Sequence, residues 1–136
     1  MTNLRVIDTN VWIFGFFWTS FPAQIVSQVY ANQITPVFTL ATWLELTSRT
    51  QTLAAKLQSL NEGNLLLKKI HQKANFTNPT QSINLCRDPH DNMLLEAAQS
   101  SHTPYLITGD KDLLTLKRIE QTVILTPKQY ISIKII

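Results

Sequence analysis

The sequence predicts an α/β fold in which a mostly parallel sheet carries helices on both faces. Short apolar segments typical of buried strands alternate along the chain with segments whose apolar residues recur at helical spacing. This alternation indicates parallel strands joined by helices, and in such folds the ligand crevice lies outside the carboxyl ends of the strands. The 136 residues, 44% of them hydrophobic, suffice for one core. No repeat or linker-like stretch divides them, so we expect a single domain over residues 1–136.

The first strand is predicted at residues 4–8, where LRVID is apolar, β-branched and closed by an aspartate. An apolar helix is expected from Val11. Ser20 and Pro22 are typical of the start of a second helix, because proline is well tolerated in a first helical turn. Residues 35–40, TPVFTL, predict the second strand.

A long helical stretch follows, and its broken apolar stripe stops near Gly63. Residues 64–75 predict another helix. The segment FTNPTQSINLC, at residues 76–86, predicts a loop with a short extended piece, and a further helix is expected from Pro89.

The last third of the chain predicts two more strands, PYLIT at residues 104–108 and TVIL at residues 122–125. A short helix, DLLTLK at residues 112–117, lies between them. A proline-led helical turn is expected to begin the final segment, TPKQYISIKII.

Composition excludes several functional classes. No P-loop or dinucleotide-binding fingerprint can be built from the three glycines, and no serine lies in a Gly-x-Ser-x-Gly elbow. The single cysteine, Cys86, rules out an internal disulfide and suits the reducing cytosol. The N-terminus lacks the features of a signal peptide, and the run VWIFGFFW at residues 11–18 is shorter than the about 20 residues that cross a bilayer. We therefore expect a cytoplasmic protein with no membrane segment, and a core helix or a protein interface for this run.

The charge of the chain is unevenly distributed along the sequence. Twelve Lys and Arg residues face nine Asp and Glu residues, for a net charge of +3. Six of the nine acids lie in or near motifs: Asp8, Glu45, Asp88, Asp91, Asp110 and Asp112. If these six converge, the protein has one acidic spot on a basic body, and a basic surface attracts phosphate polyanions. Dispersed, solvated lysines are the alternative.

Two of these acids close predicted strands. Asp8 ends the first strand, and Asp110 follows PYLIT after one glycine. Both therefore belong at the carboxyl edge of the sheet, where a crevice is expected. Each could instead cap a helix, a common role for aspartate. Asp112 directly precedes LLTLK, and we expect it to be the cap of that helix.

Asp88 and Asp91 stand at the start of the predicted helix CRDPHDNMLLEAA. With Asp88 as N-cap, Pro89 takes the first helical position and Asp91 the third, as in a capping box. Asp91 also heads the apolar stripe that continues through Leu94 and Leu95, so its carboxylate points along the buried face. A buried carboxylate is costly unless a positive charge meets it. We therefore expect Asp88 to cap the helix and Asp91 to act as a ligand.

Glu45 follows the second strand on the next helix, near the same predicted sheet edge. Converging carboxylates repel one another and need protons or cations to coexist. All-oxygen ligands suit Mg²⁺ or Mn²⁺. Zinc is not indicated, because Cys86 has no partner cysteine and the three histidines show no ligand spacing. We expect His90 to be a surface residue of the first helical turn.

The motifs resemble those of the PIN domain, and more closely those of the bacterial PIN-family toxins of toxin–antitoxin systems (VapC-like). VIDTNVWI, a helical glutamate after the second strand, CRDPHDNMLLEAA and YLITGDKDLL occur in the order typical of that family and span residues 6–116. RDPHDN followed by LITGDKDLL is fairly specific in combination, whereas DTN alone is a weak signal. The segment TLATWLEL lacks the serine that often precedes the helical acid.

This resemblance implies a three-layer α/β/α sandwich and a metal-dependent endoribonuclease that hydrolyses RNA phosphodiester bonds. It also implies, as partners, an antitoxin protein and a second copy of the chain. The acidic quartet of the family, which binds Mg²⁺ or Mn²⁺ and is catalytic, maps onto Asp8, Glu45, Asp91 and Asp110. The remaining positions that match are Asp112, which would hold a water or a second ion, and Asn10 and Thr108, which would support the site by hydrogen bonding.

Other functions fit the residues less well. A phosphatase that forms an aspartyl phosphate on Asp8 needs a second aspartate two residues later, where the sequence has Asn10. A phosphate-accepting receiver domain normally has a pair of acids after its first strand. The non-enzymatic alternative is a degenerate PIN module that binds RNA or a protein. Arg49, Arg87 and Lys111 are candidates for contacts with RNA phosphates, or else solvated surface charges.

Overall fold

The computed structural model describes residues 3–133, and within that range one six-stranded sheet has the order β3-β2-β1-β4-β6-β5. Neighbouring strands are parallel, except that β5 and β6 are antiparallel. The strands are β1 (Leu4–Ile7), β2 (Thr35–Phe38), β3 (Asn75–Phe76), β4 (Tyr105–Ile107), β5 (Arg118–Ile119) and β6 (Thr122–Leu125). The predicted α/β class with a mostly parallel sheet is confirmed. The short strands β3 and β5 were not predicted as strands; β3 lies where the end of a helix and the start of a loop with a short extended piece were expected.

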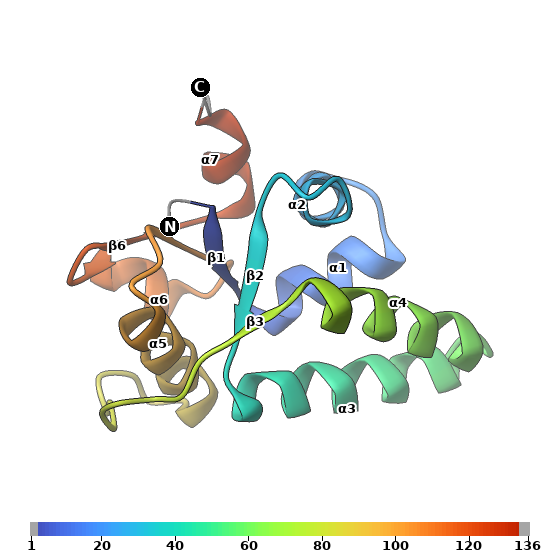
Figure 1. Cartoon of the computed structure of the whole chain (residues 1–136), viewed down its shortest axis with the longest axis horizontal. Coiled ribbons are helices and arrows are strands. Elements are labelled where there is room, and N and C mark those ends of the chain that lie inside the picture. Colours follow the sequence, from blue (N-terminus) through green and yellow to red (C-terminus); the bar gives the residue numbers. More distant parts are fainter. Residues whose placement is uncertain (1–2, 134–136) are drawn as a thin grey trace.

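Helices cover both faces of this sheet, as Figure 1 shows, and the three-layer α/β/α arrangement is therefore confirmed. The helices α5 and α6 pack on one face, and the apolar cluster on the other face is formed with α1, α2, α3, α4 and α7. The helices are α1 (Thr9–Phe17), α2 (Phe21–Tyr30), α3 (Leu40–Lys56), α4 (Leu60–Lys73), α5 (Pro89–Ser101), α6 (Lys111–Leu116) and α7 (Pro127–Ser132). No helix among residues 3–133 is long and apolar enough to span a membrane.

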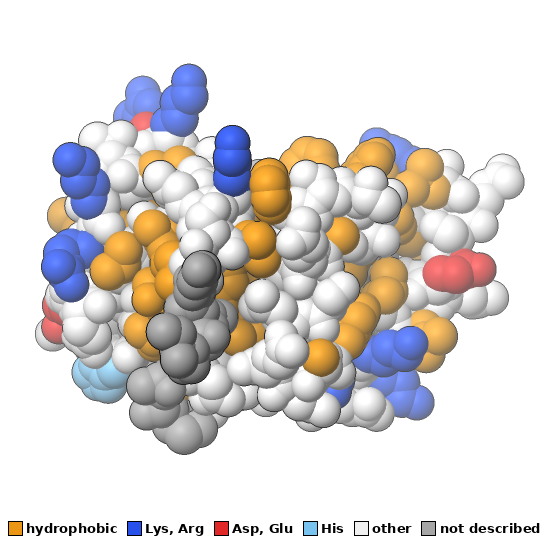
Figure 2. All heavy atoms as spheres, turned by 90° about the horizontal axis from the view of Figure 1, so that it is seen from above, with side chains coloured by type: hydrophobic (Ala, Val, Ile, Leu, Met, Phe, Trp, Pro, Cys, Tyr) orange, Lys and Arg blue, Asp and Glu red, His pale blue; other side chains and the backbone are white. Residues whose placement is uncertain are grey.

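The face of the molecule seen from above the view of Figure 1 mixes apolar and basic side chains. On the face seen in Figure 2, Lys and Arg side chains lie mostly near the outline, with apolar side chains between them. On this face the basic residues are therefore dispersed rather than gathered into one patch (Figure 2).

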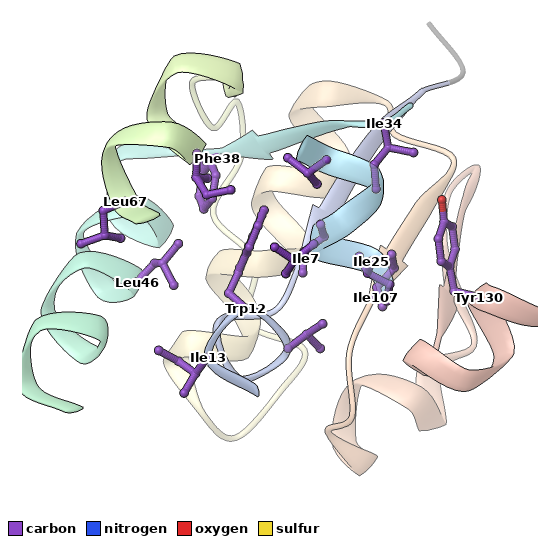
Figure 3. Close-up of a cluster of buried hydrophobic side chains, with 14 residues drawn as sticks. Ile7, Trp12, Ile13, Ile25, Ile34, Phe38, Leu46, Leu67, Ile107 and Tyr130 are labelled. Atoms are coloured by element: carbon purple, nitrogen blue, oxygen red, sulfur yellow. The ribbon is translucent and has the colours of Figure 1, made fainter. Parts of the chain in front are cut away.

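The alternation of side chains along β1 fills both cores. Val6 faces α5, whereas its neighbour Ile7 joins the cluster on the opposite face, as the period of two along a strand requires. Trp12 of α1 lies at the centre of that second cluster (Figure 3). Its ring stacks on Phe38 with centroids 5.7 Å apart, and only 1% of the residue is exposed. Aromatic burial of this kind holds α1 against the end of β2.

The apolar run at residues 11–18 divides between core and surface. Val11, Trp12 and Ile13 are buried, which confirms the expected core helix for the first turns of α1. Phe14 and Trp18 remain 53% and 51% exposed.

The position of β1 and β4 at the middle of the sheet creates the edge on which the site is built. From this pair the chain adds β2 and β3 on one side and β6 and β5 on the other. Ile7 pairs with Ile107, and the backbone N–H of Asp8 donates to the Ile107 carbonyl at 2.9 Å. The residues that follow the two strands therefore meet at the same carboxyl edge, at the point where the strand order reverses. Parallel α/β sheets bind ligands at such a point.

The predicted boundary between the two long helices is wrong. The first helix, α3, ends at Lys56, and the chain turns at residues 57–59, where Gln58 has a left-handed φ of 55°. Gly63 lies inside α4 rather than at a helix end. A Cβ atom at Gly63 would lie 2.8 Å from the Cβ of Ala54 in α3. This glycine is therefore a point of close contact between two helices, a packing role that has no local sequence signature.

We expect Gly63→Ala to destabilise the protein by up to about 2 kcal/mol. The new methyl group meets a rigid neighbour and separates α3 from α4, a cost of about 1 to 3 kcal/mol that the better helix propensity of alanine offsets by about 1 kcal/mol. Urea unfolding followed by circular dichroism measures the change. Lys68→Ala, an exposed change on the same helix, is the matched control, and a Gly63→Ala protein as stable as that control would contradict the close contact.

Candidate metal centre

A cavity of about 580 Å³ opens at the carboxyl edge of the sheet. Its walls come from the ends of β1 and β4, from the middle of α3 and from the start of α5. The acidic residues that line it are Asp8, Glu45, Asp88, Asp91 and Asp110. Asp112 adds a sixth, because its carboxylate oxygen lies within 4.8 Å of oxygens of Asp91 and Asp110. All six motif acids thus converge on one site, as the charge distribution of the sequence suggested.

Three of these carboxylates are helix N-caps. Asp8, Asp88 and Asp110 cap α1, α5 and α6 by accepting the backbone N–H groups of Asn10 (3.3 Å), His90 (2.9 Å) and Asp112 (2.8 Å). A carboxylate is favoured here because the first N–H groups of a helix have no partner within the helix. Capping and lining the cavity are therefore compatible roles. The expected cap of α6 was Asp112, and this is wrong, since Asp110 occupies the cap position and Asp112 lies in the first turn.

Thr108 connects the two strand ends. Its hydroxyl donates to Asp8 Oδ2 at 2.6 Å and accepts the backbone N–H of Asp110 at 3.0 Å. The residue is fully buried, so this geometry is fixed by the sheet. Asn10 contributes its backbone N–H to Asp8 Oδ1, and Asn10 also lines the cavity. Hydrogen-bond support by Thr108 was expected from the sequence, whereas a role for the Asn10 side chain stays a prediction.

The Asp91 carboxylate is buried, and within the described part of the chain one of its oxygens has no hydrogen-bond partner to offset that burial. The residue is 5% exposed, and its Oδ2 atom is buried without a hydrogen-bond partner among residues 3–133. Burial raises the pKa of Asp91 to about 6, and the negative charges of Asp110 and Asp88 add to the effect. An oxygen buried in this way and aimed into an acidic site is what a divalent cation would satisfy. The donor set of Asp91, Asp110 and Asp112 fits a hard cation.

Opposing effects act on Asp8. Burial raises its pKa above the ordinary value, the hydrogen bond from Thr108 lowers it, and the charges of Glu45 and Asp110 raise it again. The net direction is upward, chiefly because of burial, so the charged form of the Asp8 carboxyl is disfavoured.

Glu45 reaches the cavity from α3 and contacts two basic side chains. Its Oε2 lies 2.5 Å from Nδ1 of His90, and its Oε1 lies 3.8 Å from Nη1 of Arg49. The Glu45 side chain is 14% exposed, whereas that of His90 is 59% exposed. The expectation that His90 lies at the surface is confirmed. Its contact with Glu45 was missed, because the two residues are far apart in sequence and meet only where α3 packs against α5.

Asp112 lies at the outer side of the site, where Arg87 covers it. Nη2 of Arg87 donates to both carboxylate oxygens of Asp112 at 3.2 Å. The Arg87 side chain is 90% exposed and that of Asp112 is 39% exposed, so solvent screens this pair and its contribution to stability is small. Arg87 therefore lies beside the acids with its charge partly engaged. Lys111, in the first turn of α6, is exposed.

The loop before α5 is fixed by a residue to which the sequence reasoning gave no role. The side-chain amide of Asn92 accepts the backbone N–H of Cys86 at 2.8 Å and donates to the Cys86 carbonyl at 3.0 Å. One turn later, Glu96 accepts the backbone N–H of Ile83 at 2.9 Å. These bonds hold the chain that leads into Asp88, and so fix the start of α5. Asn92 stands directly after Asp91 in RDPHDN, which was the available signal.

The fold and the clustered carboxylates agree with the comparison with known proteins. Residues 5–112 match the PIN domain family, and the chain belongs to this family. PIN domains are generally nucleases that use divalent metals. The chain is 31% identical over 117 residues to MJ1680, an uncharacterized protein of Methanocaldococcus jannaschii, with 82% of this chain and 74% of that protein covered. It also resembles the crystal structure of PAE2754 from Pyrobaculum aerophilum, with a TM-score of 0.62, 14% identity, and 95% of this chain and 86% of that chain covered.

The raised pKa of Asp91 predicts that the stability of the metal-free protein depends on pH. The ordinary value of 3.8 rises to about 6 in the folded state, so the folded state binds this proton more tightly. Protonation of Asp91 therefore stabilises the metal-free folded state. This contribution to the free energy of unfolding is fully present below about pH 4 and is lost as the pH rises through 6, a change of up to about 3 kcal/mol. Urea unfolding in EDTA between pH 4 and pH 7 measures it, and Asp91→Asn should flatten the dependence.

Asp8 titrates in the same direction, so Asp91→Asn should leave a smaller residual slope. Glu62→Gln, an exposed change on α4, is the matched control and should keep the wild-type slope. If the free energy of unfolding depends on pH in the same way for wild type and Asp91→Asn, the pKa of Asp91 is not raised by folding and the prediction is wrong.

Proposed function

We propose that this protein is an endoribonuclease that hydrolyses RNA phosphodiester bonds with Mg²⁺ or Mn²⁺. The observation that carries the proposal is the convergence of six of the nine acids on one cavity, with oxygens of Asp91, Asp110 and Asp112 within 4.8 Å of one another. Like charges held together in this way need cations to coexist. Membership of a family of nucleases makes a phosphodiester the natural substrate.

The proposed ligands are Asp91, Asp110 and Asp112, whose carboxylate oxygens lie within 4.8 Å of one another, together with Asp8 and Glu45, which line the same cavity. All offer carboxylate oxygens, which are the ligands that Mg²⁺ and Mn²⁺ prefer. The unpartnered Oδ2 of Asp91 is available to a cation without loss of a hydrogen bond. When bound, the cation supplies a Lewis acid that activates a water molecule and offsets charge on the phosphate.

The chain's own groups orient these ligands. Thr108 fixes the Asp8 carboxylate through its hydroxyl proton, and its buried position keeps water from competing for that bond. His90 holds Glu45 through Nδ1, which leaves Nε2 to hold or transfer a proton at the leaving oxygen. Arg49 lies at the same rim with 47% of its side chain exposed, and its guanidinium can bind an RNA phosphate.

The biological role we propose is that of the toxin in a toxin–antitoxin pair, acting on RNA in the cytoplasm. Leu44 lines the acidic cavity and is 56% exposed, and Leu40 one turn earlier is 68% exposed. Catalysis has no need of apolar side chains at this position, whereas an antitoxin segment that covers the site would bury them. A second copy of the chain is a further proposed partner.

Purified protein should cleave RNA with Mn²⁺ or Mg²⁺ and not in EDTA. Asp8→Asn and Asp91→Asn should each lower the rate at least about 100-fold, since each removes a ligand charge from the site. Gel analysis of end-labelled RNAs measures cleavage, and circular dichroism verifies folding. Glu62→Gln, outside the cavity, should cleave at the wild-type rate.

Two outcomes would overturn this proposal in different ways. Cleavage that persists in EDTA would contradict the metal requirement. A wild-type protein that binds RNA without cleaving any of those tested with either metal would support the alternative, a catalytically degenerate PIN module.

Expression of the wild-type protein alone should arrest growth of a bacterial host, and Asp91→Asn at equal expression should not. The difference is expected because growth arrest depends on RNA cleavage rather than on the presence of the chain. Colony counts and growth curves after induction measure the effect. Equal growth in both cultures, with RNA cleavage demonstrated in vitro, would reject the toxin role and keep the nuclease.

A further inference from the structure

A second cavity, of about 300 Å³, adjoins the acidic one and shares two of its lining residues, Asn10 and Asp110. Its other walls are mainly apolar and come from Phe14 of α1, Pro22 of α2 and Pro127 of α7. The carboxylate site and this cavity therefore lie side by side, with Asn10 and Asp110 bordering both. A polymer with one phosphate at the acids has its neighbouring unit within reach of the second cavity.

An exposed aromatic side chain stands in this cavity. Phe14 is 53% exposed, although the three residues before it in α1 are buried. Its ring contacts that of Trp18 one turn later, with centroids 5.3 Å apart, and Trp18 is itself 51% exposed. The pair thus presents a braced aromatic surface beside a polar site, which core packing does not require.

The cavity is open at Gly109, between Thr108 and Asp110. A Cβ atom at this position would meet nothing within 4 Å, and the backbone does not have a positive φ. The glycine is therefore not needed for its conformation or for a close backbone approach. Its lack of a side chain keeps space free next to the Asp110 carboxylate.

We propose that this cavity binds an unpaired nucleobase of the nucleotide adjoining the cleaved phosphodiester, with Phe14 as the stacking surface. The inference rests on the proposed nuclease function and adds a base-binding subsite to it. Bases stack on exposed aromatic rings irrespective of sequence. The polar groups of a base edge match Asn10, and the flat apolar walls of Phe14, Pro22 and Pro127 match its faces. Phe14 is thus a residue that positions substrate.

The test uses a short single-stranded RNA whose cleavage position has been mapped, and two copies with an abasic ribose on one or the other side of that phosphodiester. Wild type should lose roughly 10- to 100-fold in kcat/KM on one of the two abasic RNAs, the range expected for one base stacked on an aromatic side chain. Most of the loss should lie in KM, because stacking holds substrate and transition state alike.

Variants of the subsite distinguish the loss of base stacking from a general loss of folding or activity. Phe14→Ala should lose a similar factor on the intact RNA and should no longer distinguish it from the abasic copy, whereas Phe14→Trp should retain both properties. Gly109→Leu should raise KM by filling the cavity. The matched control is Leu65→Ala, an apolar side chain of equal exposure (54%) on α4, which should behave as wild type.

Binding provides a readout independent of cleavage. In EDTA, the same RNAs should quench the fluorescence of exposed Trp18, and the abasic copy and Phe14→Ala should weaken binding together. Trp18→Phe should abolish the signal and so assign it. If Phe14→Ala binds and cleaves both RNAs as wild type does, the subsite is rejected and the nuclease stands.

If wild type is inert but its RNA binding depends on Phe14 and on the base, the subsite stands and the nuclease is rejected. A change of oligomeric state with Phe14→Ala, with RNA parameters unchanged, would show that a protein covers this cavity and would also reject the subsite.

Discussion

The buried carboxylate of Asp91, which has one oxygen without a hydrogen-bond partner, is the constraint around which this structure is organised. Burial raises its pKa, and the charges of Asp110, Asp88, Asp8 and Asp112 raise it further. Part of this charge is offset within the chain, by the hydroxyl of Thr108 on Asp8, by the N-termini of α1 and α5, and by Arg87 on Asp112. The oxygen that remains unsatisfied is the physical argument for a cation, and it lies in the one part of the molecule where the sheet brings separate strands to a common edge.

The same carboxylates that start helices form the site. Asp8, Asp88 and Asp110 each satisfy the first N–H groups of a helix and line the acidic cavity. In a parallel sheet every strand delivers the chain to the same edge before the next helix begins, so an N-cap is already located where ligands bind. Asp8 has both roles at once. Its two oxygens accept hydrogen bonds from the backbone N–H of Asn10 and the hydroxyl of Thr108, and its side chain also borders the cavity. Structural and chemical roles are therefore not alternatives at these positions.

The surroundings of the acids differ from one side to the other. Toward α3 lie Glu45, with His90 and Arg49 bound to it, and the exposed apolar side chain of Leu44. Toward α1 and α7 lie Phe14 and the open space at Gly109. Polar and cationic groups suit a phosphate, and an aromatic face suits a base, so under the proposed function the asymmetry would give an RNA strand a direction across the site. The likeness to PAE2754 extends to the fold alone, at 14% identity, and these flanking groups are features of this chain.

The sequence by itself determined the class of fold, four of the six strands, and the acids that close β1 and follow β4, because strand periodicity and helix starts are set by neighbouring residues. It also determined that Asp88 caps α5 and that Asp91 heads a buried stripe. Only the tertiary structure decided that Asp110 rather than Asp112 caps α6, that Gly63 is a contact between α3 and α4, and that Glu45 meets His90. Those outcomes depend on how elements far apart in the chain pack together, since local patterns specify which face of an element is buried but not which side chain it will meet.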